Sequence, residues 1–115
     1  MDTNEIGKDL IRRLRVTTLP WADHISEKKM FGGLCVLYKG KMSVGETKGR
    51  LMVRVVSEKI EAALARDHVY PMDFTGKPMK EFIFVHSPGF DTEEKLQQWV
   101  ELGITHAERK ATEKK

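Results

Sequence analysis

The chain has 115 residues, 40% of them hydrophobic, which is enough apolar surface for one modest core in a single domain spanning residues 1–115. Its formal net charge is +3, and its single cysteine, Cys35, excludes an internal disulfide. The sequence has neither the apolar core of a signal peptide nor a run of about 20 apolar residues that could span a bilayer, so we expect a cytoplasmic protein.

The first expected element is an amphipathic helix within residues 2–15. Ile6, Leu10 and Leu14 recur at four-residue steps and share one face, with charged residues opposite. Leu19-Pro20 ends this helix because proline cannot continue it. We expect residues 20–29 to form an irregular connection.

A change of pattern at Met30 predicts antiparallel strands joined by tight turns. The apolar run 34–38 suits a central strand, residues 42–47 alternate in polarity, and residues 50–56 form a third strand. Lys39-Gly40-Lys41 supplies the first turn, in which Gly40 can adopt a positive φ, and Lys48-Gly49 turns the chain again.

The second half of the chain is expected to add two helices and two strands. A short helix is predicted over residues 58–67, followed by strands at 69–74 and 81–86. The last helix begins at an acidic capping box formed by Asp91 and Glu94, and residues 108–115 form a frayed tail. This order predicts a two-layer α+β domain with a mostly antiparallel sheet of about five strands and helices on one face.

Gly32-Gly33 raises the question of a phosphate-binding loop. Such loops place backbone N–H groups at the start of a helix, yet these glycines precede a strand, so a bend or bulge is favoured. Cys35 lies within an apolar run, where a thiol is more often a core residue than a nucleophile. The four histidines are scattered, so neither a metal site, a cofactor nor a catalytic motif is predicted.

The positive charge is concentrated in residues 28–54, which carry seven basic side chains against one acidic side chain, Glu46. We expect Lys39 and Lys41 at one hairpin tip, with further basic residues at the opposite end. The residues expected at that opposite end are Lys28, Lys29, Lys48 and Arg50. The excess indicates either a surface for an acidic partner or nucleic acid, or lysine-rich turns that protect sheet edges from aggregation.

Several sequence motifs resemble those of the TfoX N-terminal domain family, both in their residues and in their order along the chain. They extend from about Ile6 to Ala107 and include "KKMFGG", "KGRLMVRV", "YPMDFTGKPMKEFIFV" and "LQQWV". The most specific motif residues are Met30, Phe31, Gly32, Gly33, Pro71, Phe74, Gly76 and Met79. The resemblance implies a secretion-chaperone-like two-layer fold in a stand-alone single-domain member, and a link to transcription or competence regulation.

The resemblance carries over no catalytic residue. We therefore expect a non-enzymatic binding or regulatory module whose partner is a protein or a second copy in a homodimer. Nucleic-acid binding through the basic residues 28–54 is the alternative, and a small enzyme with Cys35 as its nucleophile is the least favoured hypothesis. Neither membrane contact nor a small-molecule substrate is predicted.

Overall fold

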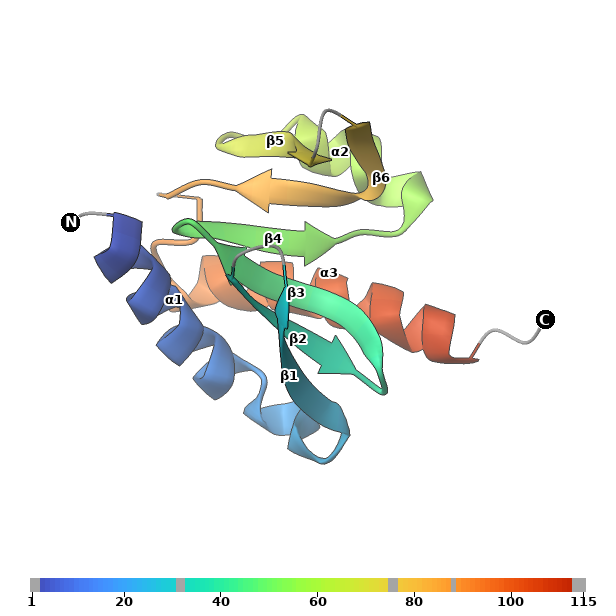
Figure 1. Cartoon of the computed structure of the whole chain (residues 1–115). Helices are drawn as coiled ribbons and strands as arrows, with labels where there is room; N and C mark the ends of the chain where they lie inside the picture. Colours follow the sequence, from blue (N-terminus) through green and yellow to red (C-terminus); the bar gives the residue numbers. More distant parts are fainter. Residues whose placement is uncertain (1–2, 31–32, 75–76, 88, 113–115) are drawn as a thin grey trace.

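Figure 1 shows the computed structural model, which describes residues 3–30, 33–74, 77–87 and 89–112. Its helices are α1 (Thr3–Thr17), α2 (Ile60–Leu64) and α3 (Glu93–Thr112), with short 3-10 helices η1 (Leu19–His24) and η2 (Ser57–Lys59). Its strands are β1 (Ile25–Met30), β2 (Gly33–Tyr38), β3 (Lys41–Thr47), β4 (Arg50–Arg54), β5 (Val69–Phe74) and β6 (Lys77–Val85). The predicted α+β class and two-layer arrangement are confirmed.

The six strands form one antiparallel sheet in the order β1-β2-β3-β4-β6-β5. Strand β6 pairs with both β4 and β5, so the chain makes an excursion through α2 and β5 before it returns to the centre of the sheet. Side chains of α1, α2 and α3 join a single apolar cluster with strand residues, which places these helices on one face. Helix α3 passes behind β3 and β4 in the view of Figure 1.

Strand β1 is the main departure from the sequence prediction. The expected irregular connection over residues 20–29 is wrong from Ile25 onward, because Ile25–Met30 pairs with β2 at the sheet edge. Ser26, Glu27, Lys28 and Lys29 are all exposed, so this strand lacks the alternation by which a half-buried strand is recognised. Ile25 packs against the helix-side core, and Arg15 of α1 adds a polar tie by donating two hydrogen bonds to Glu27, at 2.9 and 3.0 Å.

The core between sheet and helices is built from fully buried aliphatic and aromatic side chains. Leu10 and Leu14 of α1, Leu96 and Trp99 of α3, and Leu51 of β4 are each at most 1% exposed. Each such side chain contributes about 1.5–3 kcal/mol relative to an exposed position. The helical periodicity read from the first segment is thus confirmed by burial.

Helix α3 lies against β3 at a β-bulge. The pairing of β2 with β3 runs from Val36↔Val44 to Leu37↔Met42, so Ser43 is an extra residue on β3. The Ser43 hydroxyl donates to the Val36 carbonyl at 2.8 Å and thereby satisfies a buried polar group. Above the bulge, a Cβ on Gly103 would lie only 2.4 Å from the Ser43 carbonyl oxygen. This close approach requires glycine.

The start of α3 differs by one residue from the predicted capping box. Thr92 precedes the helix, and its hydroxyl accepts a hydrogen bond from the Lys95 backbone N–H at 3.1 Å. Asp91 instead pairs with the Lys95 ammonium group at 3.1 Å. The prediction of Asp91 as the cap is therefore wrong, and the helix begins one residue later than the predicted box indicated.

Two helix boundaries and the start of β6 also differ from the prediction, since β6 begins at Lys77 rather than at residue 81. Helix α2 ends at Leu64, and only the 3-10 helix η2 precedes it, so the segment expected over residues 58–67 is shorter as an α-helix. At the other end, α3 continues to Thr112, so residues 108–112 are helical rather than frayed. Arg109 donates to Glu58 at 2.7 Å and ties this last turn to η2.

The two Lys-Gly turns have the same backbone geometry. Lys39 and Gly40 have φ values of 50° and 80°, and Lys48 and Gly49 have 52° and 77°. Positive φ at both central residues is the signature of a type I′ hairpin turn, whose twist matches that of the flanking strands. The positive φ predicted at Gly40 is confirmed, Gly49 shares it, and each lysine also adopts a conformation that is unfavourable for a non-glycine residue.

We predict that Gly103→Ala lowers the free energy of unfolding by about 1–3 kcal/mol, because the added methyl group overpacks the contact with Ser43. This loss outweighs the gain of about 1 kcal/mol that alanine brings to a helix. Chemical denaturation measures the change. Gly7→Ala in α1 is the comparison, since its Cβ would meet the end of the Glu46 side chain rather than backbone, so it should lower stability less. Equal stability of the two variants would contradict the prediction.

We predict that Gly40→Ala lowers the free energy of unfolding by about 1–2 kcal/mol through backbone strain alone. No heavy atom lies within 4 Å of the added Cβ, and φ at this position is +80°. Lys39→Asn should change stability in the opposite direction, because asparagine tolerates this conformation better than lysine. Urea unfolding of both variants tests the pair, and an unchanged midpoint for Gly40→Ala would count against the turn assignment.

Candidate binding surface

The face of the sheet opposite the helices is called the outer face. Directly paired residues of antiparallel strands point to the same face, so the register defines rows across the sheet. One such row crosses all six strands of the sheet and lies on the outer face. Its members, in strand order, are Lys28, Cys35, Gly45, Met52, Phe84 and Tyr70.

The centre of the outer face is apolar. Cys35, Met52 and Phe84 form a second buried cluster, against which Met42 and Phe82 are packed. None of these five residues belongs to a helix, so within the described part of the chain this cluster is made by the strands. Strand side chains therefore fill the middle of the face.

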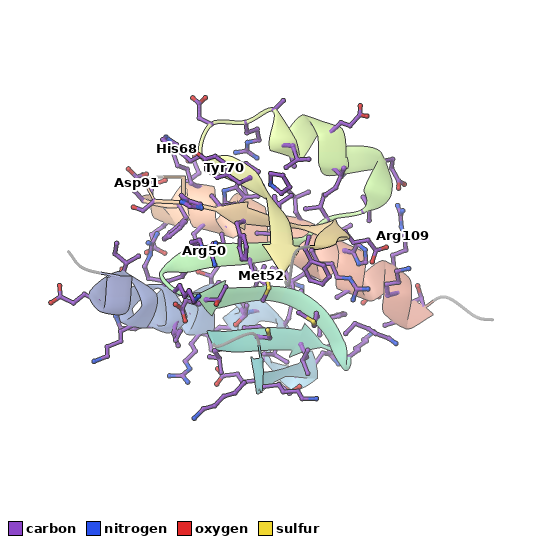
Figure 2. All side chains as sticks on the ribbon, turned by 45° about the horizontal axis from the view of Figure 1, so that its top comes forward. Arg50, Met52, His68, Tyr70, Asp91 and Arg109 are labelled. Carbon is purple, nitrogen blue, oxygen red and sulfur yellow. The ribbon has the colours of Figure 1, made fainter. Side chains whose placement is uncertain are left out.

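Arginine side chains cover the aromatic rings of this centre. The Arg50 guanidinium carbon lies 3.8 Å from the ring centroid of Phe84, and that of Arg54 lies 5.4 Å from Phe82. Arg54 also pairs with Glu81 at 3.0 Å. Tyr70 completes the row at the edge and is 51% exposed. Figure 2 shows Arg50, Met52 and Tyr70 on the side of the sheet turned toward the viewer.

The structure places the predicted basic residues at the two ends of the sheet. Lys28 and Lys29 pair with Cys35 and Leu34 near the start of β2, the end at which Arg50 pairs with Thr47. Lys39 and Lys41 flank the opposite turn. The expected division of the basic residues between two opposite ends of the sheet thus agrees with the register. A binding role for these residues stays a prediction.

Most of these basic residues are not neutralised. Lys39 pairs with Glu108 at 3.5 Å. The other five predicted residues make no ion pair with any described residue; they are Lys28, Lys29, Lys41, Lys48 and Arg50. By contrast, the helical residues Arg12, Arg13, Lys95 and Arg109 each face a carboxylate.

The family motif residues lie along β1, β2, β5 and β6. Met30 ends β1 and Gly33 begins β2, whereas Phe31, Gly32 and Gly76 lie outside the described residues. A Cβ on Gly33 would lie 1.7 Å from the Glu46 carbonyl oxygen, so this glycine permits close backbone approach to β3. Since Gly33 leads into a strand, the structure supports the strand interpretation over a phosphate-binding loop. Pro71 and Phe74 belong to β5, and Met79 belongs to β6.

Two pockets flank the ends of β5 and β6, where the His86 N–H donates to the His68 carbonyl at 2.8 Å. The first, of about 310 Å³, lies between the β3–β4 turn and the residues after β6. It is lined by Ile6, Lys48, Gly49, Arg50, His86 and Ser87. Nothing in the sequence assigns His86 to a site, because it belongs to no metal-ligand spacing. It lies beside Arg50 only because of the order of the strands in the sheet.

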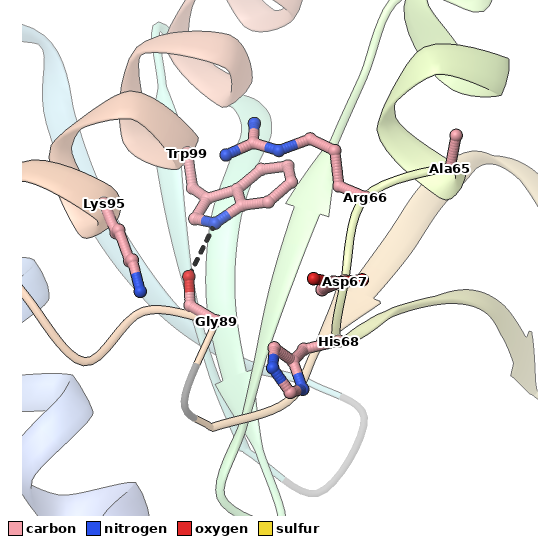
Figure 3. A pocket seen from close by; sticks show the side chains of 7 residues that line it. All are labelled: Ala65, Arg66, Asp67, His68, Gly89, Lys95 and Trp99. Atoms are coloured by element: carbon pink, nitrogen blue, oxygen red, sulfur yellow. Dashed lines mark hydrogen bonds between the residues drawn. The ribbon is translucent and has the colours of Figure 1, made fainter.

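The second pocket, of about 450 Å³, lies on the helix side of His68 (Figure 3). Its floor is Trp99, whose indole N–H donates to the Gly89 carbonyl at 3.1 Å. Arg66 stacks over the Trp99 ring at 4.1 Å, and Asp67, His68 and Lys95 complete the lining. This pocket contains both signs of charge, because Asp67 lines it and Lys95 is paired with Asp91.

A buried polar cluster joins α3 to the sheet. His106 is 2% exposed, and its Nε2 lies 3.5 Å from a Glu81 carboxylate oxygen that also faces Lys110. Burial lowers the pKa of His106, and the charge of Arg54 adds to this effect, while Glu81 opposes it. Burial would raise the pKa of Glu81, but its hydrogen bond with Arg54 and the neighbouring positive charges lower it. The cluster holds α3 in place.

The structure does not give Cys35 the environment of a nucleophile. The residue is fully buried, and this burial raises the pKa of its thiol to about 11. A reactive thiol needs a lowered pKa and access to substrate. Among the described residues, no group of three or more His, Cys, Asp or Glu side chains could hold a metal ion. No described helix is long and apolar enough to cross a membrane.

Comparison with known proteins identifies a family. The family model of the TfoX N-terminal domain matches residues 18–107, a range that includes every strand of the sheet and most of α3. No curated protein matches the chain significantly.

We predict that Cys35 does not react with a thiol reagent in the native protein. The raised pKa leaves a negligible thiolate fraction at neutral pH, and the strands exclude the reagent. Titration with an aromatic disulfide should detect the thiol only after denaturation. Rapid stoichiometric reaction of the folded protein would overturn this assignment and revive the nucleophile hypothesis.

Proposed function

This chain belongs to the TfoX N-terminal domain family, and from this premise we propose that it is a non-enzymatic regulatory module that binds a protein partner in the cytoplasm. The partner contributes an acidic segment, which lies along strand β1 and the basic end of the outer face. The support comes from the regulatory character of the family together with the charges on this surface.

The observation that carries the proposal is the set of cations without carboxylate partners. Lys28 and Lys29 are exposed on an edge strand and make no ion pair with a described residue. Their neighbour Glu27 is held by Arg15, so its charge is already satisfied. Two adjacent lysines on one strand repel each other, and an acidic partner relieves that repulsion while gaining two charge-assisted contacts.

Strand β1 also offers backbone groups to a partner. Among the described strands, β1 pairs only with β2, so its other edge faces away from the sheet. An extended segment can add to such an edge by backbone hydrogen bonding. Because Lys28 and Lys29 point to opposite faces of the sheet, they can contact acidic residues at successive positions of the segment. This geometry favours an extended acidic peptide over a folded flat surface.

The environment of the titratable groups supports a binding role over an enzymatic one. The Cys35 thiol has a raised pKa and no access to substrate. Among the described carboxylates, Glu81 and Glu108 have lowered pKa values, Glu81 through Arg54 and nearby charges despite its burial, and Glu108 through a hydrogen bond from Tyr38. A general acid at neutral pH requires the opposite shift.

Nucleic-acid binding is the second candidate, and one observation favours it. Tyr70 is 51% exposed and belongs to the same outer face as Arg50, which makes no ion pair with a described residue. An exposed aromatic ring beside a cation is the arrangement on which single-stranded bases stack.

We predict that a labelled acidic peptide binds the protein in fluorescence anisotropy with an affinity that decreases as salt is added. Lys28→Glu combined with Lys29→Glu should abolish this binding. The matched control, Lys8→Glu with Lys59→Glu, changes the net charge equally at exposed helical positions that also lack ion pairs within the described residues. The control should retain most of the affinity.

A single-stranded oligonucleotide of the same net charge separates the two candidates. Tighter binding of the oligonucleotide than of the peptide, with a steep salt dependence, would replace the protein-partner proposal by the nucleic-acid one. Equal loss of peptide binding in both double variants would show general charge attraction and would contradict a site on β1.

A further inference from the structure

The pocket between the β3–β4 turn and the end of β6 is lined by donors of positive or neutral character. Its polar side chains are those of Lys48, Arg50, His86 and Ser87, and none of the described residues that line it is acidic. The nearest acidic side chain in the turn is Glu46, whose carboxylate is 8% exposed and accepts a hydrogen bond from the Gly49 N–H at 2.8 Å. Glu46 therefore holds the turn from beneath.

Two of the groups around this pocket, Arg50 and His86, are held in place by neighbouring residues. The Arg50 guanidinium is stacked 3.8 Å from the Phe84 ring centroid, which fixes its plane. Its only recorded hydrogen bond within the described residues is a long one of 3.5 Å from Nε to the Thr47 carbonyl, so its terminal nitrogens are open. A stacked, planar guanidinium is suited to bidentate contact with an oxyanion.

His86 is positioned by two neighbours. Its backbone N–H donates to the His68 carbonyl at 2.8 Å, and its ring makes an edge contact with Tyr70 at 4.7 Å between centroids. Partial burial lowers the pKa of His86, and the positive charges of Arg50 and His68 lower it further. The contribution of Arg50 to this shift agrees with its position beside His86 in the lining of the pocket.

We propose that this pocket binds the phosphate group of a small phosphorylated molecule. Arg50 supplies two parallel N–H donors, Lys48 a mobile ammonium group, Ser87 a hydroxyl and His86 a ring N–H. The oxygens of a tetrahedral phosphate dianion can accept hydrogen bonds from all four of these side chains, whereas a planar carboxylate has only two oxygens that accept. The volume of about 310 Å³ is at the small end of ligand pockets, which favours a small molecule over a folded domain.

This inference goes beyond the protein-partner proposal and does not depend on it. The acidic segment is assigned to Lys28 and Lys29 on β1, whereas the phosphate is assigned to the turn and the end of β6. The sequence did not predict a small-molecule ligand. The pocket needs the return of β6 between β4 and β5, which places His86 and Ser87 beside Lys48 and Arg50.

The two equivalent hairpin turns provide a matched experiment. Lys48→Asn removes one charge from the pocket at a φ of 52°, a conformation that asparagine accepts, so the fold is retained. Lys39→Asn makes the same change at a φ of 50° in the turn at the other end of the sheet. Titration with inorganic phosphate, followed by backbone amide NMR, should give saturable shifts at Gly49, Arg50, His86 and Ser87.

Lys48→Asn should weaken phosphate binding by about tenfold, the effect of one charge-assisted hydrogen bond. Lys39→Asn should leave it unchanged. Arg50→Lys retains the charge but loses the planar fork, so it should also bind less tightly. Lys48, Arg50, His68 and Tyr70 surround His86. A bound phosphate should nevertheless raise the pKa of His86, because a bound anion favours the charged imidazole. Imidazole NMR across a pH series measures this shift.

Several outcomes would overturn the inference. Shifts that do not saturate, or an equal loss of binding in the Lys48 and Lys39 variants, would show only general attraction of anions. Acetate binding as tightly as phosphate would contradict the choice of a tetrahedral dianion. A phosphoserine peptide that binds far more tightly than a small phosphate monoester would assign the pocket to a phosphorylated protein instead. Loss of peptide binding through Lys28→Glu and Lys29→Glu with phosphate binding retained would separate the two proposals.

Discussion

The contact between Gly103 and the bulge at Ser43 determines how the rest of the molecule is arranged. A side chain at residue 103 would occupy the space of the Ser43 carbonyl oxygen, so glycine alone lets α3 lie directly on β3. The bulge is itself stabilised because the Ser43 hydroxyl bonds to Val36. With α3 in this position, Trp99 enters the core and His106 reaches Glu81, while α1 packs beside it. One face of the sheet is thereby occupied.

The outer face follows from the position of the helices. Its centre is filled by Met52, Cys35 and Phe84 from the strands, and arginine side chains cover the aromatic rings of Phe84 and Phe82. The apolar part of this face is thus satisfied locally, and charge becomes the property available to a partner. Helical cations mostly face carboxylates, whereas those of the strands and turns near the start of β2 do not. This division separates side chains that stabilise the fold from those free to bind.

The sequence was sufficient to predict elements whose burial follows a simple period. Leu10 and Leu14 indicated α1, and the Lys-Gly turns indicated the hairpins, because in each case the signal is local. Strand β1 was missed because its middle residues are exposed on both faces. The cap of α3 was misassigned by one residue, since Asp91 and Thr92 are both good capping residues and only the backbone decides between them. His86 was missed because its neighbours come from other strands.

The two hairpin turns show why the sequence could not identify the pocket beside His86: residues distant in sequence determine what each turn does. Both consist of lysine and glycine at positive φ followed by a basic residue, and their backbones are nearly identical. Lys39 lies beside Tyr38 and pairs with Glu108 of α3, so its charge contributes to the packing of the helix. Lys48 instead lines a pocket with Arg50, His86 and Ser87, and no lining residue in the described part of the chain is acidic. The same three-residue pattern is structural at one end of the sheet and available for binding at the other, and the difference comes from α3 and β6, which are distant in sequence.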